Sequence, residues 1–320
     1  MKKIFFFFCI VVLTNAVLAQ SFPDSWTDGK YYTVNGAKLY TVTVGTGEPM
    51  IIIPGGPGGA HIPYRGFDSL TVNSNIRLIY YDAFGRGKSD TAKDVKEYSL
   101  ERDIEDIEGL RIAMHLNKIS LLGHSYGSLV AQGYAIKYGQ NLSHLIIANG
   151  FHSFVMWQEN DDNSNHEIKT NYPEVWDTLM KIREKGSISS DEIHQEIYGR
   201  VPYGFLYAYN PGNFVGGGGG KSYPNPFNTK LYYQMVGKDG DFIVGSDIGN
   251  FDFRKQLKDL KMPVLIIAGR FDRVAVPVMQ VKYKEYCPQA KFVMFERSGH
   301  NPQVEEHVKE FALIKDFMKN

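Results

Sequence analysis

Residues 121–127 read Leu-Leu-Gly-His-Ser-Tyr-Gly, an apolar stretch that leads directly into the pattern Gly-x-Ser-x-Gly. This spacing is typical of a tight turn between a strand and a helix, which exposes the hydroxyl of Ser125 above the edge of a sheet. Gly123 and Gly127 lack the side chains that would clash in such a turn. The backbone N–H of Tyr126 is then in the position of an oxyanion-hole donor.

Short apolar segments alternate with helical patterns along most of the chain. Ile51–Ile53 and Val264–Ala268 are apolar throughout, as is typical of parallel strands buried on both faces. Apolar residues recur at spacings of three and four from Leu100 to Met114, and Ser99 is the predicted N-cap of this helix. We therefore predict an α/β fold, with a mostly parallel eight-stranded sheet and helices on both faces. The predicted strands are Tyr31–Val34, Leu39–Val44, Met50–Ile53, Ile76–Tyr81, Ile119–Leu122, Leu145–Ala148, Val264–Ala268 and Phe292–Phe295, and Val304, Val308, Phe311 and Phe317 indicate a closing helix.

The regular alternation stops between Ala148 and Val264. More than 100 residues separate them, whereas a crossover between parallel strands needs about a dozen or more. We predict a mainly helical lid over the strand ends, where open α/β sheets bind their ligands. The predicted division is 1–19 leader, 20–149 first part of the core, 150–250 lid and 251–320 second part of the core. Gly216–Gly220 is predicted to be a flexible loop within the lid.

The first 19 residues have the pattern of a secretory signal. Lys2 and Lys3 precede the apolar run Ile4–Leu13, and Val17-Leu18-Ala19 forms a small-residue cleavage site. An apolar run of about ten residues is too short to cross a ~30 Å hydrocarbon layer. We expect export to the periplasm or the extracellular space, with an uncleaved membrane anchor as the alternative; only the anchor implies contact with a membrane.

Composition excludes several classes of function. The 320 residues carry a formal net charge of zero, so no basic surplus points to nucleic acid. Of the two cysteines, Cys9 lies in the predicted leader, so only Cys287 remains after cleavage and we expect no internal disulfide. The nine histidines lack a His-Glu-x-x-His pattern, so we expect no metal. Val215–Ser222 imitates a phosphate-binding loop, but its first glycine is missing and Tyr223–Pro226 cannot open the required helix. We expect no nucleotide and no cofactor.

A serine nucleophile needs a base and a group that orients the base. Asp272 and His300 each follow one of the last two predicted strands. The chain order Ser125, Asp272, His300 is that of the α/β-hydrolases and differs from the order in the two familiar serine-protease folds. We predict these three residues as a catalytic triad, in which each residue lies at the C-terminal end of a strand.

The loop after Ile51–Ile53 supplies the second predicted oxyanion donor. It reads Pro-Gly-Gly-Pro-Gly-Gly at 54–59, and glycines allow the backbone to approach a substrate oxygen closely. We assign the donor to the N–H of Gly56, together with that of Tyr126.

The chain resembles the proline iminopeptidase family of α/β-hydrolases from about residue 31 to the C-terminus. The resemblance rests on Gly-Gly-Pro-Gly at 55–58, Asp82–Ser89, Gly-His-Ser-Tyr-Gly at 123–127, Gly-Arg-Phe-Asp at 269–272 and Ser-Gly-His at 298–300. It implies the α/β-hydrolase fold with a lid and a serine aminopeptidase activity. Pro54 stands where the family usually carries His, but the backbone donor at Gly56 survives this difference.

The resemblance also implies two positions for substrate recognition, where family aminopeptidases hold the free amine with carboxylates. The first corresponds to Asp241, which keeps an acid on a shorter stem. The second is Arg273, which reverses the charge. If Arg273 faces the pocket, a carboxylate or ester substrate is favoured; if it points to solvent, Asp241 alone anchors the amine.

The sequence thus predicts an exported serine hydrolase that releases N-terminal proline or another small residue from short peptides. An esterase, lactonase or amidase with the same machinery is the alternative, with a small ester in place of the peptide. A non-catalytic binding module is a third reading, against which the complete triad argues. Asp-based hydrolases are disfavoured because residue 125 is Ser. The oligomeric state stays open.

Overall fold

The computed structural model describes residues 28–213 and 223–319. Within these ranges, eight strands form a sheet in the order β1-β2-β4-β3-β5-β6-β7-β8. β2 pairs antiparallel with β1 and β4, and the other neighbours are parallel. All eight predicted strands are present, so the predicted sheet is confirmed. The strands are β1 (Lys30–Val34), β2 (Ala37–Gly45), β3 (Glu48–Ile53), β4 (Ile76–Tyr81), β5 (Ile119–His124), β6 (Leu142–Ala148), β7 (Val264–Gly269) and β8 (Lys291–Phe295).

The central strands are buried on both faces, as their continuous apolar sequences predict. Every residue of β5 and β7 is buried. Alternate residues of β3 enter different clusters: Ile51 and Ile53 belong to one apolar core, and Met50 and Ile52 to another. This alternation follows from the two-residue period of a strand, and it places one core on each face of the sheet.

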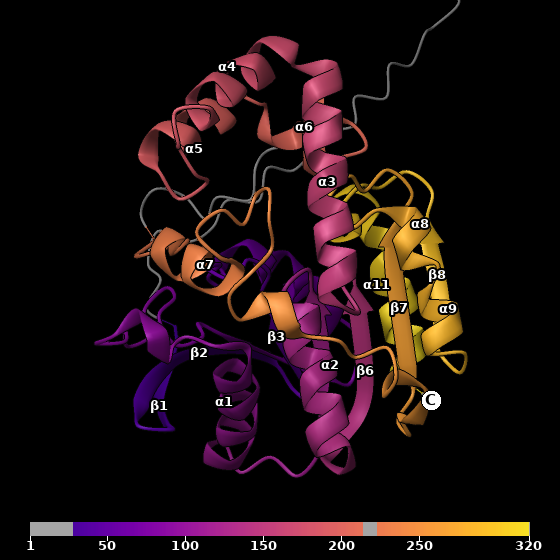
Figure 1. Cartoon of the computed structure of the whole chain (residues 1–320). Helices are drawn as coiled ribbons and strands as arrows, with labels where there is room; N and C mark the ends of the chain where they lie inside the picture. Colours follow the sequence, from indigo (N-terminus) through magenta and orange to yellow (C-terminus); the bar gives the residue numbers. More distant parts are fainter. Residues whose placement is uncertain (1–27, 214–222, 320) are drawn as a thin grey trace, which may run out of the picture.

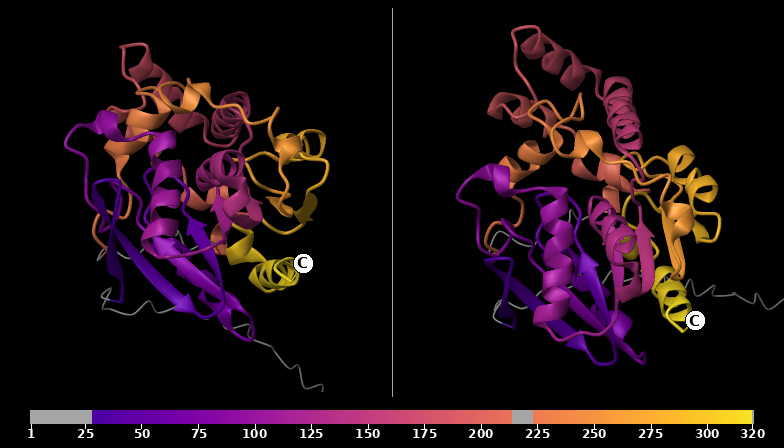
Figure 2. Two further views of the ribbon diagram at one scale, coloured as in Figure 1. Left: turned by 90° about the horizontal axis from the view of Figure 1, so that it is seen from below. Right: turned by 60° about the horizontal axis from the view of Figure 1, so that its bottom comes forward.

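Helices cover the two faces separately (Figure 2). Helices α1 (Leu100–Ala113) and α2 (Gly127–Tyr138), with the short α8 (Pro277–Gln280) and α9 (Tyr283–Tyr286), pack over one face. The 3-10 helix η1 (Ile62–Thr71) and α11 (His307–Phe317) pack over the other. The hydroxyl of Ser99 accepts a hydrogen bond from the N–H of Arg102, so the predicted N-cap of α1 is confirmed.

The predicted closing helix is wrong in one respect. The chain forms two helices, α10 (Pro302–Glu305) and α11, and Val304 and Val308 are 54% and 73% exposed. The break lies at Glu306, whose carboxylate accepts hydrogen bonds from the N–H of Arg297 at 2.9 Å and the hydroxyl of Ser298 at 2.8 Å. Because this residue leaves helical geometry, Val304 does not share the buried face of the later phenylalanines. Val308 lies in α11 with Phe311 and Phe317 but faces solvent.

Residues 149–263, which we call the insertion, connect β6 to β7. Figure 1 shows α4, α5 and α6 projecting beyond the sheet, with the long α3 linking them to the end of β6. The insertion contains α3 (Phe154–Asn171), α4 (Pro173–Arg183), α5 (Glu192–Tyr198), α6 (Tyr203–Tyr207) and α7 (Thr229–Val236). Short 3-10 helices complete the chain: η2 (Val95–Glu97), η3 (Gly139–Asn141), η4 (Pro211–Asn213), η5 (Ile248–Asn250) and η6 (Leu257–Asp259). The predicted leader and the Gly216–Gly220 loop lie outside the described residues.

Candidate active site

Ser125 occupies the strand-to-helix turn that the Gly-x-Ser-x-Gly spacing predicts. It follows β5, precedes α2, and has a φ of 54°, a left-handed conformation that costs a non-glycine residue about 1–2 kcal/mol. Its N–H donates to the carbonyl of Ala148 at 3.0 Å, which holds the turn against the end of β6. A methyl group on Gly123 would lie 2.3 Å from the carbonyl oxygen of Gly127, so the turn excludes larger residues there.

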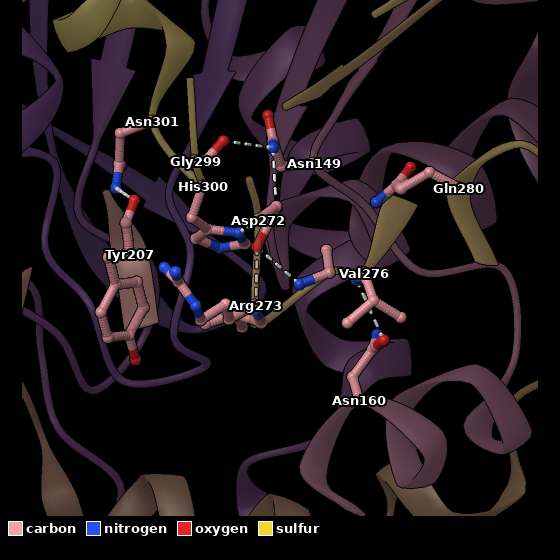
Figure 3. A network of polar contacts seen from close by, with 12 residues as sticks. Asn149, Asn160, Tyr207, Asp272, Arg273, Val276, Gln280, Gly299, His300 and Asn301 are labelled. Carbon is pink, nitrogen blue, oxygen red and sulfur yellow. Dashed lines mark hydrogen bonds and ion pairs between the residues drawn. The ribbon is translucent and has the colours of Figure 1, made fainter. Parts of the chain in front are cut away.

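The loops after β7 and β8 bring Asp272 and His300 into direct contact (Figure 3). Nδ1 of His300 lies 2.8 Å from Oδ2 of Asp272, and both side chains are buried. Oδ2 also accepts a hydrogen bond from Nδ2 of Asn149 at 2.8 Å. Asn149 directly follows β6, so three adjacent strands each contribute one of these residues at the same edge of the sheet.

The other oxygen of Asp272 fixes the carboxylate in place. Oδ1 accepts hydrogen bonds from the backbone N–H groups of Val274 and Ala275, each at 2.8 Å. Every neighbour of the carboxylate is therefore a donor, and Nδ1 of His300 must carry a proton to join them. The lone pair of the imidazole is left on Nε2, the tautomer that a general base for Ser125 requires.

His124, the residue before Ser125, contacts the backbone of His300. Nε2 of His124 lies 2.7 Å from the carbonyl oxygen of His300, and the two imidazole rings are 4.8 Å apart between centroids. The three residues predicted as a triad thus belong to loops that contact one another.

The predicted oxyanion loop lies against Ser125. A methyl group on Gly55 would lie 3.0 Å from Cβ of Ser125. Gly56 has a φ of 135°, and a methyl group there would lie 2.2 Å from the nitrogen of Gly58, so the loop requires glycine. Among residues 28–213 and 223–319, no hydrogen bond is donated by the backbone N–H of Gly56 or Tyr126. Both groups keep the capacity to bind an oxyanion.

Asp241 lies in the insertion among tyrosine side chains. Its Oδ2 accepts a hydrogen bond from the hydroxyl of Tyr233 at 2.9 Å. Burial raises the pKa of Asp241 to about 6, and the Tyr233 hydrogen bond only partly offsets that effect. An acid in this state gains from a nearby cation, because a cation would stabilise its ionised form.

Arg273 is held by two groups of the insertion. Its Nε lies 3.3 Å from Oε2 of Glu167 on α3, and its Nη1 donates to the carbonyl of Phe205 at 2.9 Å. The guanidinium also lies over the Phe205 ring, 5.0 Å from its centroid. The side chains of Arg273 and Glu167 are 28% and 31% exposed. The positive charge is therefore balanced by a neighbouring acid.

Sequence reasoning missed a second acid beside Asp241. Oδ2 of Asp161, on α3, is buried without a hydrogen-bond partner among the described residues. Burial, and after it the charge of Asp241, raise the pKa of Asp161 well above its usual range. Asp161 belongs to no motif, so the sequence carried no signal for it.

Tyr207 lies between this acidic region and His300, the predicted base. Its ring lies 5.6 Å from the imidazole of His300 between centroids, and its carbonyl accepts the N–H of His300 at 2.8 Å. The pKa of Tyr198 and of Tyr232 is raised by burial and then by Asp241, with Asp161 and Tyr207 contributing. The two acids, these tyrosines and His300 therefore form one neighbourhood.

Other chemistry is sparse in the described part of the chain. The described residues contain no group of three or more His, Cys, Asp or Glu side chains arranged to hold a metal ion. None of their helices has the length and apolar character needed to cross a bilayer. A cavity of about 730 Å³ is lined by residues that include Lys118, Leu142 and Pro263, at the opposite ends of β5, β6 and β7 from Ser125.

Comparison with known proteins places this geometry in context. Residues 48–180 and 207–307 match the family model of the alpha/beta hydrolase fold. The chain is 30% identical over 290 residues to a proline iminopeptidase of Saccharolobus solfataricus, covering 88% of this chain and 87% of the relative. It is 28% identical over 278 residues to a proline iminopeptidase of Heyndrickxia coagulans, covering 86% and 92%. The solved proline iminopeptidase of Mycobacterium smegmatis shares the fold, with a TM-score of 0.75 at 19% identity and coverage of 91% and 97%.

Proposed function

This chain belongs to the proline iminopeptidase-like serine hydrolases of the alpha/beta hydrolase family, and we propose that it is an aminopeptidase that releases N-terminal proline or another small residue from short peptides. In this proposal the insertion is the lid and supplies the groups that recognise the substrate's amine.

The proposed reaction proceeds through an acyl-enzyme. Ser125 attacks the carbonyl carbon of the first residue while Nε2 of His300 takes the hydroxyl proton, and Asp272 holds the imidazole in the required tautomer. The N–H groups of Gly56 and Tyr126 stabilise the oxyanion of the tetrahedral intermediate, where losing one donor typically costs about 2.7–4 kcal/mol. His300 then protonates the leaving amine, and water hydrolyses the ester on Ser125.

One observation carries the aminopeptidase proposal: Asp161 and Asp241 lie close together in the insertion, and one buried oxygen of Asp161 has no partner among the described residues. The Trp157 side chain lowers the pKa of Asp161 only in part, so the buried carboxylate stays costly to ionise, and a protonated amine between the two acids would reduce that cost. Tyr207 lies against His300, and its charge and those of the two acids all influence the pKa of Tyr232, so the acids and His300 lie in the same region of the molecule.

The charge of Arg273 does not oppose this proposal. An unpaired arginine beside the site would repel an ammonium group, but Glu167 balances it in a contact of 3.3 Å. Asp241 and Asp161 are then the acids near Tyr207 whose pKa values burial raises, and a bound cation would favour the ionised form of both. We therefore assign Arg273 to holding the insertion, through the Phe205 carbonyl, and not to binding a substrate carboxylate.

A substrate pair that differs only at the amine tests the proposal. We expect the enzyme to hydrolyse prolyl-naphthylamide and to lose most of its kcat/KM on the N-acetylated form. Asp161→Asn and Asp241→Asn should raise KM for the free amine without changing the reaction rate of Ser125 with a fluorophosphonate. Asp162→Asn is the matched control, because Asp162 is an exposed neighbour on the same helix. Equal cleavage of the acetylated substrate would favour the esterase or amidase alternative.

We further propose that the enzyme is exported. The basic start, the apolar run Ile4–Leu13 and the small residues Val17-Leu18-Ala19 support this proposal. N-terminal sequencing of the protein recovered from the producing cells tests it. Cleavage after Ala19 supports export of a released enzyme, and a retained leader in the membrane fraction indicates an anchor instead.

A further inference from the structure

We propose that Tyr64 and His124 form a hydrogen-bond relay that positions the oxyanion loop, the Ser125 turn and the His300 loop relative to one another. The inference rests on the serine-hydrolase chemistry and is independent of the proposed amine specificity. Tyr64 and His124 act as positioning residues.

The relay consists of three contacts between distant parts of the chain. The N–H of Gly55 donates to the hydroxyl of Tyr64 at 2.8 Å, and that hydroxyl lies 2.8 Å from Nδ1 of His124. Nε2 of His124 lies 2.7 Å from the carbonyl oxygen of His300. Tyr64 belongs to η1, so the helix that covers one face of the sheet reaches the catalytic loops through this hydroxyl.

The chemistry of these groups allows only one arrangement of protons. The carbonyl of His300 can only accept, so Nε2 of His124 carries a proton and Nδ1 of a neutral ring accepts. The hydroxyl of Tyr64 already accepts from Gly55, so its own proton goes to Nδ1 of His124. Along the relay, each group therefore donates a hydrogen bond to the next, from the N–H of Gly55 to the carbonyl of His300.

The surroundings keep His124 neutral. Its side chain is 4% exposed, and burial, followed by the nearby His300, lowers the pKa of His124 to about 3. A protonated ring would present a second N–H to the Tyr64 hydroxyl and displace that proton. The relay therefore persists over the pH range in which a serine hydrolase operates.

With the relay, hydrogen bonds hold His300 at three of its polar groups. Its N–H is bound by the carbonyl of Tyr207, its Nδ1 by Asp272 and its carbonyl by His124. Nε2 is the nitrogen that remains for proton transfer. At the other end, Gly55 is held one residue before the proposed oxyanion donor Gly56. Catalysis depends on such geometry, because small displacements of reacting groups cost large factors in rate.

Three substitutions separate the two ends of the relay. Tyr64→Phe removes the hydroxyl and keeps the ring. His124→Asn can place an amide near the Nδ1 position but cannot reach the His300 carbonyl, whereas the longer His124→Gln can place its amide donor near the Nε2 position. We expect Tyr64→Phe and His124→Asn each to lower kcat for a neutral ester about tenfold with little change in KM. His124→Gln should recover part of the loss, because it restores the contact with the His300 carbonyl but not the contact with Tyr64.

The double variant and a control make the test specific. Residues that act as one unit are non-additive, so Tyr64→Phe/His124→Asn should lose clearly less than the product of the single losses. Tyr134→Phe is the matched control, since it removes another buried hydroxyl, bound to Glu108 at 2.7 Å, and should keep the wild-type rate. Thermal unfolding identifies any variant that fails to fold. The difference in kcat between the folded His124→Asn and His124→Gln variants then tests the relay.

Either of two results would overturn the relay: equal kcat for His124→Asn and His124→Gln, or wild-type kcat in a folded Tyr64→Phe. The rate of phosphonylation of Ser125 by a fluorophosphonate should follow the same order as kcat. A wild-type protein that does not react with this probe would instead refute the serine chemistry itself, which distinguishes the two failures.

Discussion

The imidazole of His300 lies edge-on to the ring of Tyr207, with the two centroids 5.6 Å apart, and the N–H of His300 donates to the Tyr207 carbonyl at 2.8 Å. Tyr207 ends α6, so the proposed base is held by the insertion as well as by the sheet. In the proposed function, the insertion that would recognise the substrate therefore contacts the residue that would move its proton.

The Asp272→Asn variant tests the orientation of His300. Both backbone donors at Oδ1 require an acceptor, so the oxygen of the introduced amide would face them and its NH₂ would face His300. Nδ1 would then have to accept, and the proton would move to Nε2, where it blocks the base. We expect kcat to fall by about 10³–10⁴-fold with little change in KM. Steady-state hydrolysis of a neutral ester measures this loss.

Asp259→Asn, a substitution of an exposed aspartate on η6, is the control for that experiment and should keep full activity. A loss of less than about tenfold in Asp272→Asn would mean that the carboxylate does not select the tautomer of His300.

The pH dependence of amine recognition follows from Asp241. Its pKa is raised to about 6, chiefly by burial, so the carboxylate is charged above this pH and neutral below it. We expect kcat/KM for a prolyl amide, divided by that for a neutral ester, to fall as the pH decreases through about 6. The ratio cancels the protonation of His300, which both substrates share.

Asp161 and the Asp241→Asn variant give two further expectations for the same ratio. The pKa of Asp161 is raised further, so its ionisation extends the increase of the ratio to higher pH. Asp241→Asn should lower the ratio and remove its change near pH 6. A ratio that is independent of pH in the wild-type protein contradicts a role for either acid in binding the amine.

The fold could be predicted almost completely from the sequence, because continuous apolar runs such as Ile51–Ile53 have few alternatives to a buried strand. The contact between Asp272 and His300 was also predictable, since the C-terminal ends of adjacent parallel strands meet at one edge. The contact of Asn149 with Asp272 was predictable for the same reason, because Asn149 directly follows the adjacent strand β6.

The remaining parts of the site depend on contacts that no periodicity encodes. Asp161 is one of several acids on α3, and only packing of α3 against Asp241 distinguishes it. The partner of Arg273 is Glu167, which lies more than 100 positions away. The exposed Val304 shows the same limit, since α10 and α11 part at Glu306, whose carboxylate binds Arg297 and Ser298 outside both helices.

Glu167→Gln should leave the positive charge of Arg273 without its acidic partner. The ion pair is partly exposed, so its removal is worth at most about 1 kcal/mol, and KM for a prolyl amide should rise a few-fold at low salt. The effect should shrink as salt screens the charge, and KM for a neutral ester should not change. The double variant Glu167→Gln/Arg273→Gln should return KM for the amide toward the wild-type value. A double variant that binds the amide no better than Glu167→Gln rules out repulsion by Arg273.

Glu310 on α11 provides a test of stability. It is fully buried, neither carboxylate oxygen has a partner among the described residues, and burial, followed by Glu306, raises its pKa to about 8. The ordinary value for glutamate is 4.5. Between these two pH values the folded protein binds more protons at Glu310 than the unfolded chain, so the free energy of unfolding decreases as the pH rises.

Glu310→Gln is neutral at every pH and removes this decrease. We expect the variant and the wild-type protein to unfold at similar temperatures near pH 5, and the variant to be more stable by about 1–3 kcal/mol near pH 8.5. Chemical denaturation at the two pH values measures the difference directly. Glu296→Gln, which removes an exposed pair with Arg270, is the control and should show only a small change at either pH. A stability difference between Glu310→Gln and wild type that is the same at both pH values would mean that Glu310 titrates as an ordinary surface acid and that the chain relaxes to hydrate it.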